Sequence, residues 1–508
     1  MITGLGAIFL PLCIFYWRTP LRLLQLTFIG AAFAAAAVLV LGGYGVAPGL
    51  LPALLFIGYF LLRLALGATY PTENGVLRVL TPFILVVIGA LVSSLLMPRF
   101  FEDQIFVWPQ KLSGFDVLTP LSPNAGNYTQ DMYLLTNAGL TVAACFYAVT
   151  IGRNMQLLFN TYLYAGLLVV GISLWQFTSN TLHIWFPTSF FLSNPGWALL
   201  SDENIGSVIR LTGPFSEPAA LAGYLCGTVG ASGWMIFNGD RRLLTRLALI
   251  LGLGVLLLCT STTGYIALLL MMAGLALYTF VVGSATLKKR VLIGLTAAGV
   301  VVAIAIAAAP AVAPGLAHHA VNIFTATVSK QQSSSYMDRT STDLDSLKAA
   351  AASYGLGVGW GSNRSSSLFP GLAASVGVWG IAGLLWFVAR ILFHVRIAQR
   401  RASSPELKMV IHGCTGGLIG ILVAASISAP VLTSPDFYLL LGLLIAAAGR
   451  LRWEASGAHA ALPRFTAFAA PKAVAQRTPL PGQWQKNGQS RPRPAESGRK
   501  LTDKPPLW

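Results

Sequence analysis

The sequence is short of charged residues. Only 10% of its 508 residues are Asp, Glu, Lys or Arg, whereas an ordinary soluble domain carries about 25%. A water-soluble globular fold is therefore excluded for most of the chain. The five cysteines form no CxxC pair, and the six histidines are scattered, which excludes a disulfide framework and a clustered metal site. We therefore expect buried free cysteines, no metal and no cofactor.

Apolar residues are abundant instead. They make up 55% of the chain, and the mean hydropathy is +0.68. Because only helices and closed barrels satisfy their backbone in lipid, and spans of roughly 20 apolar residues suit helices, we expect an all-α polytopic bundle of about 12 to 14 transmembrane helices. The candidate spans are the apolar runs at about 2–16, 24–46, 49–67, 79–97, 131–151, 155–177, 208–237, 247–260, 262–283, 291–313, 372–393, 409–428 and 436–449.

Basic clusters predict which connections face the cytoplasm. They fall at alternate connections, and the positive-inside rule places them all on the cytoplasmic side. The clusters are Arg18 and Arg22, Arg63 and Arg78, Arg153, DRRLLTR (240–246), KKR (288–290) and HVRIAQRR (394–401). The net charge of +17 thus reflects topology, and we expect membrane lipids and no nucleic acid as partners.

Three connections, 98–130, 178–207 and 314–371, then face the opposite side. The membrane domain would cover residues 1–450 and contain 314–371 as a large extracytoplasmic loop. Residues 452–508 are basic, rich in proline and without apolar periodicity, which predicts a disordered cytoplasmic tail.

One apolar run contains unusual residues. RLTGPFSEPAALAGYL (210–225) carries Arg210 and Glu217, seven residues apart. On one helix they would share a face about 10 Å apart, with Pro214 and Pro218 disturbing the backbone. A carboxylate at membrane depth is a hypothesis of function. The alternatives are an arginine that extends to the interface and a structural Arg–Glu brace.

The large loop contains a second group of candidates. Four glycines between 355 and 361, among them Gly357 and Gly359, allow a backbone to approach a ligand closely. Arg339 and Arg364 flank them, and arginine suits bidentate binding of phosphate oxygens. We expect KAAAASYG (348–355) to end a short helix with Gly355 as its cap. The alternative is a flexible loop with solvated charges.

Three segments together resemble a known family. RLTGPFSEPAALAGYL resembles the Arg-x-x-Gly-x-Phe-x-Glu-Pro-(Ser/Ala) signature of bacterial polysaccharide polymerases in the O-antigen ligase/polymerase superfamily. CTSTTGYIALLL (259–270) resembles their Ser/Thr-Thr-Gly turn, and GLGVGWGSNRSSSLFPGLAASVGVWG (355–380) their glycine element with its returning helix. The order agrees across about 205–395. The chain departs from the pattern at RSSSLF (364–369), where ligases and some polymerases have a His-Asn pair.

The resemblance implies a GT-C-like, inverting, metal-independent membrane glycosyltransferase of the bacterial cytoplasmic (inner) membrane. It would join undecaprenyl-diphosphate-linked repeat units into a capsular, exo- or O-antigen polysaccharide. Chain-length regulator and flippase proteins would be further partners. The alternatives are a ligase that transfers glycan to a lipid or protein acceptor, and a transporter or flippase of the same lipid-linked oligosaccharide.

We predict the site residues from this glycosyltransferase interpretation and from the negative charge that develops on the leaving diphosphate. We expect Arg210, Arg339 and Arg364 to bind the diphosphate. Glu217 is the first candidate for the general base, or for orienting an arginine, and Asp338 is the second. Gly357 and Gly359 would contact the substrate through their backbone.

Overall fold

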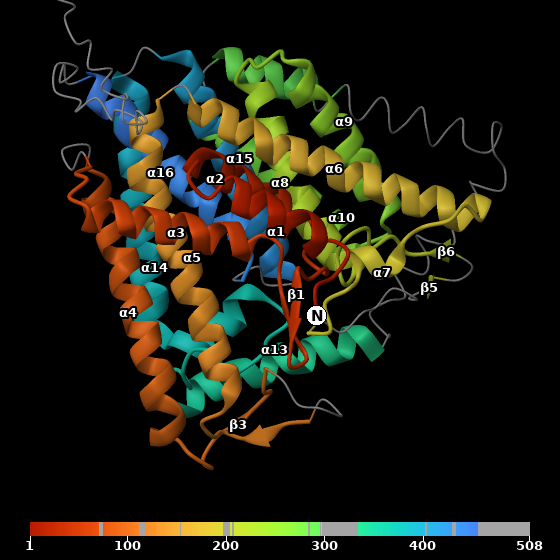
Figure 1. Ribbon diagram of the computed structural model, residues 1–508, viewed down its shortest axis with the longest axis vertical. Helices are drawn as coiled ribbons and strands as arrows, with labels where there is room; N and C mark the ends of the chain where they lie inside the picture. Colours follow the sequence, from red (N-terminus) through yellow and green to blue (C-terminus); the bar gives the residue numbers. More distant parts are fainter. Residues whose placement is uncertain are drawn as a thin grey trace, which may run out of the picture. The chain divides into compact units, whose positions relative to one another are not determined.

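The protein consists mainly of α-helices (Figure 1). Seven helices in the described part of the chain are long and apolar enough to cross a membrane, so the chain is a polytopic helical membrane protein, as predicted. The computed structural model describes residues 1–70, 75–110, 117–152, 154–196, 204–205, 208–282, 285–294, 296, 334–401, 404–428 and 433–455. The seven helices are α4 (Val76–Phe100), α5 (Ala125–Ile151), α6 (Asn154–Leu182), α8 (Pro218–Phe237), α10 (Thr262–Val282), α14 (Leu368–Arg401) and α15 (Pro405–Ile427).

Further elements complete the described fold. The helices are α1 (Gly6–Phe15), α2 (Pro20–Ala31), α3 (Leu50–Ala65), α7 (Thr188–Phe191), α9 (Leu243–Leu258), α13 (Ser334–Ala352) and α16 (Pro435–Ala455). Three antiparallel hairpins pair β1 (Leu39–Leu41) with β2 (Tyr44–Val46), β3 (Phe106–Val107) with β4 (Thr119–Pro120), and β5 (Asn204–Ile205) with β6 (Val208–Ile209).

Two predicted spans have the wrong bounds. The run 24–46 is not one helix, because α2 ends at Ala31 and the chain then forms the β1–β2 hairpin. The hairpin turn places Gly42 and Gly43 at φ 55° and 83°, a left-handed backbone that glycine adopts without strain. The run 208–237 is helical only from Pro218.

The predicted number of spans also differs from the count in the structure. We expected about 12 to 14, and seven described helices meet the requirement of length and hydropathy, with three shorter apolar helices beside them. The run 291–313 lies largely outside the described residues, as does the tail after Ala455, the last residue of α16.

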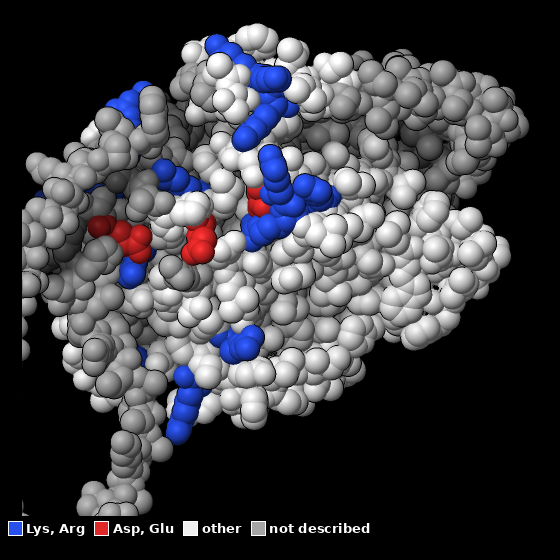
Figure 2. All heavy atoms as spheres, turned by 90° about the horizontal axis from the view of Figure 1, so that it is seen from above, with Lys and Arg blue, Asp and Glu red and all other residues white. Residues whose placement is uncertain are grey.

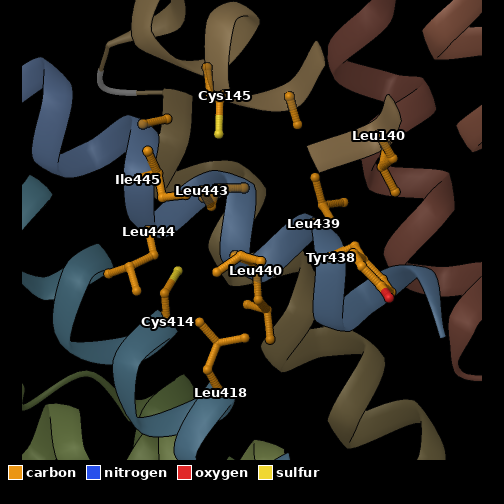
Figure 3. Close-up of a cluster of buried hydrophobic side chains, with 14 of the residues drawn as sticks. Leu140, Cys145, Cys414, Leu418, Tyr438, Leu439, Leu440, Leu443, Leu444 and Ile445 are labelled. Carbon is orange, nitrogen blue, oxygen red and sulfur yellow. The ribbon is translucent and has the colours of Figure 1, made fainter. Parts of the chain in front are cut away.

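Helix α16 lies in the centre of the largest core cluster. Its residues from Tyr438 to Ala448 are buried on all sides, as expected for a helix that is enclosed by protein. Figure 3 shows α16 between Cys145 of α5 and Cys414 and Leu418 of α15. All five cysteines are free and buried, as predicted.

Helices α8 and α15 approach each other through glycines. A Cβ added to Gly416 would lie 2.3 Å from the carbonyl oxygen of Gly230, and one added to Gly420 would lie 2.1 Å from that of Cys226. Small residues allow such close packing where lipid provides no hydrophobic driving force between helices. The first residue of α8 and the last residues of α15 therefore lie at the same end of the bundle.

Residues 355–361, which we call the glycine loop, form hydrogen bonds to helix α14 at a break in that helix. Gly377 has φ 64° and ψ −167°, so the helix is interrupted there. The N–H of Val358 donates to the carbonyl oxygen of Ala374 at 2.7 Å, and the N–H of Val378 donates to that of Gly355 at 2.8 Å. The glycine loop thus supplies the backbone hydrogen bonds that the break removes, which buried backbone groups require.

Gly377→Ala should destabilise the fold. The backbone of Gly377 lies in a region that is essentially restricted to glycine and costs alanine about 1–3 kcal/mol, and the Cβ of alanine would lie 2.2 Å from the carbonyl oxygen of Gly355. We expect a loss of more than about 2 kcal/mol in the free energy of unfolding, measured as a lower thermal midpoint of the purified protein. The control is Gly274→Ala, since a Cβ there meets nothing within 4 Å. Equal midpoints for the two variants would contradict this account of the kink.

The basic clusters gather at one end of the bundle, which we call the basic end. Arg450 near the end of α16 donates to the carbonyl oxygen of Val149 near the end of α5, and Arg290 donates to that of Phe237 at the end of α8. Arg390 of α14 contacts the carbonyl oxygen of Arg78 in the same way. Figure 2, which views the bundle from above, shows Lys and Arg side chains over this face and few acidic ones.

The opposite end, which we call the loop end, brings together the described parts of the three predicted extracytoplasmic connections. The N–H of Arg364 donates to the carbonyl oxygen of Trp108 at 2.6 Å, which links 101–124 to 334–367. The connection 183–217 contacts the β1–β2 region, because Asn194 donates to Ala35 and Ala35 to Pro214. The basic clusters and these connections thus lie at opposite ends of the bundle, and the side of the membrane that each end faces stays a prediction.

Cysteine labelling tests that topology. In a chain without its native cysteines, an impermeant maleimide applied to intact cells should label Tyr336→Cys and spare Lys288→Cys. Both positions are exposed in the structure, so accessibility to the reagent depends on the side of the membrane. Permeabilised cells should label both, which is the control. Labelling of position 288 but not 336 in intact cells would show that the chain has the opposite orientation in the membrane.

Candidate functional site

The segment before α8 is a buried loop that α6 holds in place. The side-chain oxygen of Gln176 accepts from the N–H groups of Thr212 and Gly213, at 3.1 and 2.8 Å. Gly213 has φ 56°, and a Cβ there would lie 2.5 Å from the hydroxyl of Ser173. A larger residue would therefore displace the loop from α6.

Arg210 and Glu217 do not share a helix face, contrary to our expectation. Arg210 follows β6 in the loop and is only 8% exposed, whereas Glu217 is the N-cap residue of α8 with an extended backbone. The helix starts at Pro218 because proline at N1 has no N–H to lose and a φ suited to a helix. The argument from helical spacing therefore fails.

Glu217 contacts a residue from a distant part of the chain. A guanidinium nitrogen of Arg339 on α13 lies 3.2 Å from a carboxylate oxygen of Glu217, and another donates to the hydroxyl of Ser428 at 2.7 Å. Ser428 is the C-cap residue of α15. We call Glu217, Arg339 and Ser428 the Glu217 group.

The Glu217 group is only partly buried. The side chains of Arg339 and Glu217 are 35% and 22% exposed. Figure 1 shows α13 at the lower end of the bundle, on the side of the β3–β4 hairpin. Two cavities of about 160 and 350 Å³ are lined by other residues, around Gln25 of α2 and Thr119 of β4.

Two other charged residues of the predicted site, Asp338 and Arg364, also lie at the loop end. Asp338 is exposed and precedes Arg339 on α13. Arg364 is partly buried in the loop that leads into α14. Its role and that of Asp338 stay predictions.

Gly357 and Gly359 approach protein groups closely in the structure. Both have positive φ, 87° and 100°, and Cβ atoms there would lie 2.8 Å from the N–H of Gly377 and 2.8 Å from the carbonyl oxygen of Ser93. Glycine is therefore required at both positions by the packing of the loop against α14 and α4. Contact of these glycines with a substrate stays a prediction. The expected cap is confirmed, since Gly355 has φ 76° and donates to the carbonyl oxygen of Ala350.

Asp343 was not predicted, yet it organises the loop before α14. One oxygen of its carboxylate accepts from the hydroxyl of Ser365 and from the N–H groups of Ser366 and Ser367, at 2.7 to 3.0 Å. The other accepts from the hydroxyl of Ser367 at 2.6 Å. Asp343 follows Arg339 by one helical turn, so the same face of α13 anchors α14 and reaches Glu217.

Asp343→Ala should loosen this loop. Loss of a carboxylate that accepts two N–H and two hydroxyl bonds should cost about 2 kcal/mol, which a lower thermal midpoint of the purified protein would show. The control is Thr340→Ala, an exposed position on the same helix, whose midpoint should stay at the wild-type value. A midpoint for Asp343→Ala equal to that of the control would contradict the anchoring role.

The turn between α9 and α10 contains buried hydroxyl groups without partners. Thr260 and Ser261 are 4% and 1% exposed, and neither their side-chain oxygens nor that of Thr262 has a hydrogen-bond partner. Thr260 also has φ 50°. An unpaired buried hydroxyl costs about 1–3 kcal/mol. These hydroxyl groups therefore lower the free energy of unfolding.

Comparison with protein-family models found no match for this chain, and comparison with curated protein sequences found none.

Proposed function

We propose that this protein is a polysaccharide polymerase that joins undecaprenyl-diphosphate-linked oligosaccharide repeat units at the outer face of the bacterial cytoplasmic membrane. The observation that carries the proposal is the Glu217 group, which combines a partly exposed carboxylate with a guanidinium and a hydroxyl at the loop end. The motifs at 210–225, 259–270 and 355–380 support it through their resemblance to the O-antigen ligase/polymerase superfamily, which also suggests a GT-C-like architecture.

The chemistry needs one base and one anion-stabilising group. The acceptor hydroxyl oxygen forms a bond to the anomeric carbon of the donor, and the bond from that carbon to the phosphate oxygen breaks. The hydroxyl proton passes to a base, and the electron pair leaves with undecaprenyl diphosphate. Attack opposite the diphosphate inverts the anomeric centre.

Glu217 and Arg339 can fill the two roles. Glu217 supplies a carboxyl group, whose carboxylate form can accept a proton. Arg339 carries planar donors that suit phosphate oxygens, and Ser428 and Glu217 fix its orientation. In this assignment Glu217 is the base, or it orients the arginine that binds the diphosphate.

The basic end provides a matched control pair. Arg242 donates to Asp240 at 2.7 Å, so this pair too joins a guanidinium to a carboxylate. Burial would raise the pKa of the Asp240 carboxyl, but hydrogen bonds from Arg242 outweigh it and lower the pKa below its usual value. The control pair is therefore ionised at neutral pH and lies at the opposite end from the proposed chemistry.

Polymer synthesis by purified protein tests the proposal. With undecaprenyl-diphosphate-linked repeat units as the only substrate, wild-type protein in lipid nanodiscs should produce a ladder of longer glycans. Glu217→Gln and Arg339→Lys should each reduce the rate about 100-fold or more, the usual contribution of a general base or an oriented charge. Asp240→Asn and Arg242→Lys should retain wild-type rates if they insert normally.

Two results would contradict the assignment. Near-normal rates in both Glu217→Gln and Arg339→Lys would show that the Glu217 group only braces α13 against the bundle. If wild-type protein extends no chain in this assay, but transfers a finished glycan when that glycan and a lipid acceptor are added, the polymerase is replaced with a ligase.

A further inference from the structure

The cavity of about 160 Å³ lies where the end of α1, the start of α2 and α6 meet (Figure 1). It is lined by Tyr16, Arg22, Gln25, Leu26, Ile29 and Thr161, and we call it the Arg22 cavity. Thr161 follows Asn160, whose side-chain oxygen accepts from Arg242 of the basic end at 2.9 Å. The Arg22 cavity therefore lies on the side of the basic end, opposite the Glu217 group.

One face of α2 changes from cationic to apolar along this cavity. The four lining residues from α2 have the spacing i, i+3, i+4 and i+7, so they share one face of the helix. Leu26 and Ile29 follow Arg22 by about 6 and 10 Å along the helix axis. Since α2 starts near the basic end and leads to the β1–β2 hairpin, whose surroundings contact the loop end, the apolar part of this face is directed into the membrane.

Arg22 is held in position but has hydrogen-bond donors available. One terminal nitrogen donates to the side-chain oxygen of Gln25 at 2.9 Å, and the amide nitrogen of Gln25 donates to the hydroxyl of Thr161 at 3.0 Å. A guanidinium carries five N–H donors. Arg22 is exposed, and its side chain makes no other hydrogen bond or ion pair with the described residues. The remaining donors can therefore bind an anion.

The end of α1 beside the cavity is typical of a membrane interface. Ile14, Phe15 and Trp17 are exposed, and the guanidinium carbon of Arg18 lies 4.6 Å from the centre of the Trp17 ring. Tryptophan and tyrosine are enriched at the level of the lipid headgroups, and arginine side chains extend to that level. The half-buried ring of Tyr16, the C-cap residue of α1, carries its hydroxyl at the cavity wall.

We propose that the Arg22 cavity binds the phosphate of an anionic phospholipid from the leaflet at the basic end. The guanidinium of Arg22 and the hydroxyl of Tyr16 donate to the phosphate oxygens, and the adjoining part of an acyl chain contacts Leu26 and Ile29. The cavity has the volume of roughly five water molecules, so it takes the phosphate with its ester and leaves the chains in the bilayer. Basic pockets between transmembrane helices bind lipid headgroups in this way.

The lining favours a lipid over a soluble phosphate. A soluble phosphate would use only Arg22 and Tyr16 and would leave the apolar wall of Leu26 and Ile29 in contact with water. A phospholipid covers both parts, because its charge and its chains are joined in the same order as the residues along α2. This site is separate from the proposed chemistry at the loop end and does not depend on it.

Lipid-dependent thermal stability tests the site. The full chain is purified in a neutral detergent, phosphatidylglycerol is added, and the dissociation constant follows from the rise of the thermal midpoint. Arg22→Gln should raise the dissociation constant about tenfold, because hydrogen bonds to a charged group are lost. Tyr16→Phe keeps the ring and removes only the hydroxyl, so it should raise the constant about fivefold.

Arg246→Gln is the matched control. Arg246 of α9 is exposed near the basic end and lies outside the lining of the cavity, so its replacement removes the same charge and should leave the affinity at the wild-type value. Two further probes are phosphatidylcholine and glycerol phosphate. The first should bind more weakly because its choline repels Arg22, and the second because it has no acyl chains.

Four results would overturn the site. Wild-type affinity in Arg22→Gln, or no response of wild-type protein to phosphatidylglycerol, would show that the cavity binds no such lipid. An equal loss in Arg22→Gln and Arg246→Gln would show that the net charge alone attracts the lipid. Equal affinity for phosphatidylcholine would remove the selectivity for an anionic lipid, and equal affinity for glycerol phosphate would assign the cavity to a soluble phosphate.

Discussion

The close contact between α8 and α15 is the constraint on which the candidate site depends. Because Gly416 and Gly420 let the backbones of the two helices almost touch, the N-cap of α8 and the C-cap of α15 end beside each other. Glu217 and Ser428 occupy these two caps, so a single side chain, Arg339, can bond to both at once. Any side chain in place of these glycines would separate the helices and with them the two ends of this bridge.

Hydropathy and charge predicted the character of the fold better than its bounds. Alternating basic clusters indicated two distinct ends, and Arg290 and Arg450 do lie among the contacts of one end. The alanine-rich run 24–46 misled us, because a window of apolar residues has the same hydropathy whether it forms one helix or a short helix and a hairpin. Gly42 and Gly43 carried the signal of the turn.

The site was predictable only in part, and for a specific reason. The sequence singled out Glu217 and Arg339 as unusual charges, and the structure brings them into contact, 122 positions apart. It could not show that Gln176 of α6 holds the loop of Arg210 outside the helix, because that hydrogen bond links residues 36 positions apart. Pro218 after Glu217 was the local sign that the helix begins there. Asp343 depends on tertiary contacts with Ser365 to Ser367, more than 20 positions away, which no spacing reveals.

The break at Gly377 has a consequence for the order in which the protein is assembled. The N–H of Val358 and the carbonyl oxygen of Gly355 precede α14 in the chain, yet they complete its backbone bonding. If residues 334–361 cross the membrane as the topology requires, α14 has unpaired polar groups near its kink until that crossing is finished. In lipid such groups cost several kcal/mol, so the helix reaches its final position only after the preceding loop has been translocated and folded. Under that predicted topology, translocation of the loop and insertion of the next span are one coupled event in biogenesis.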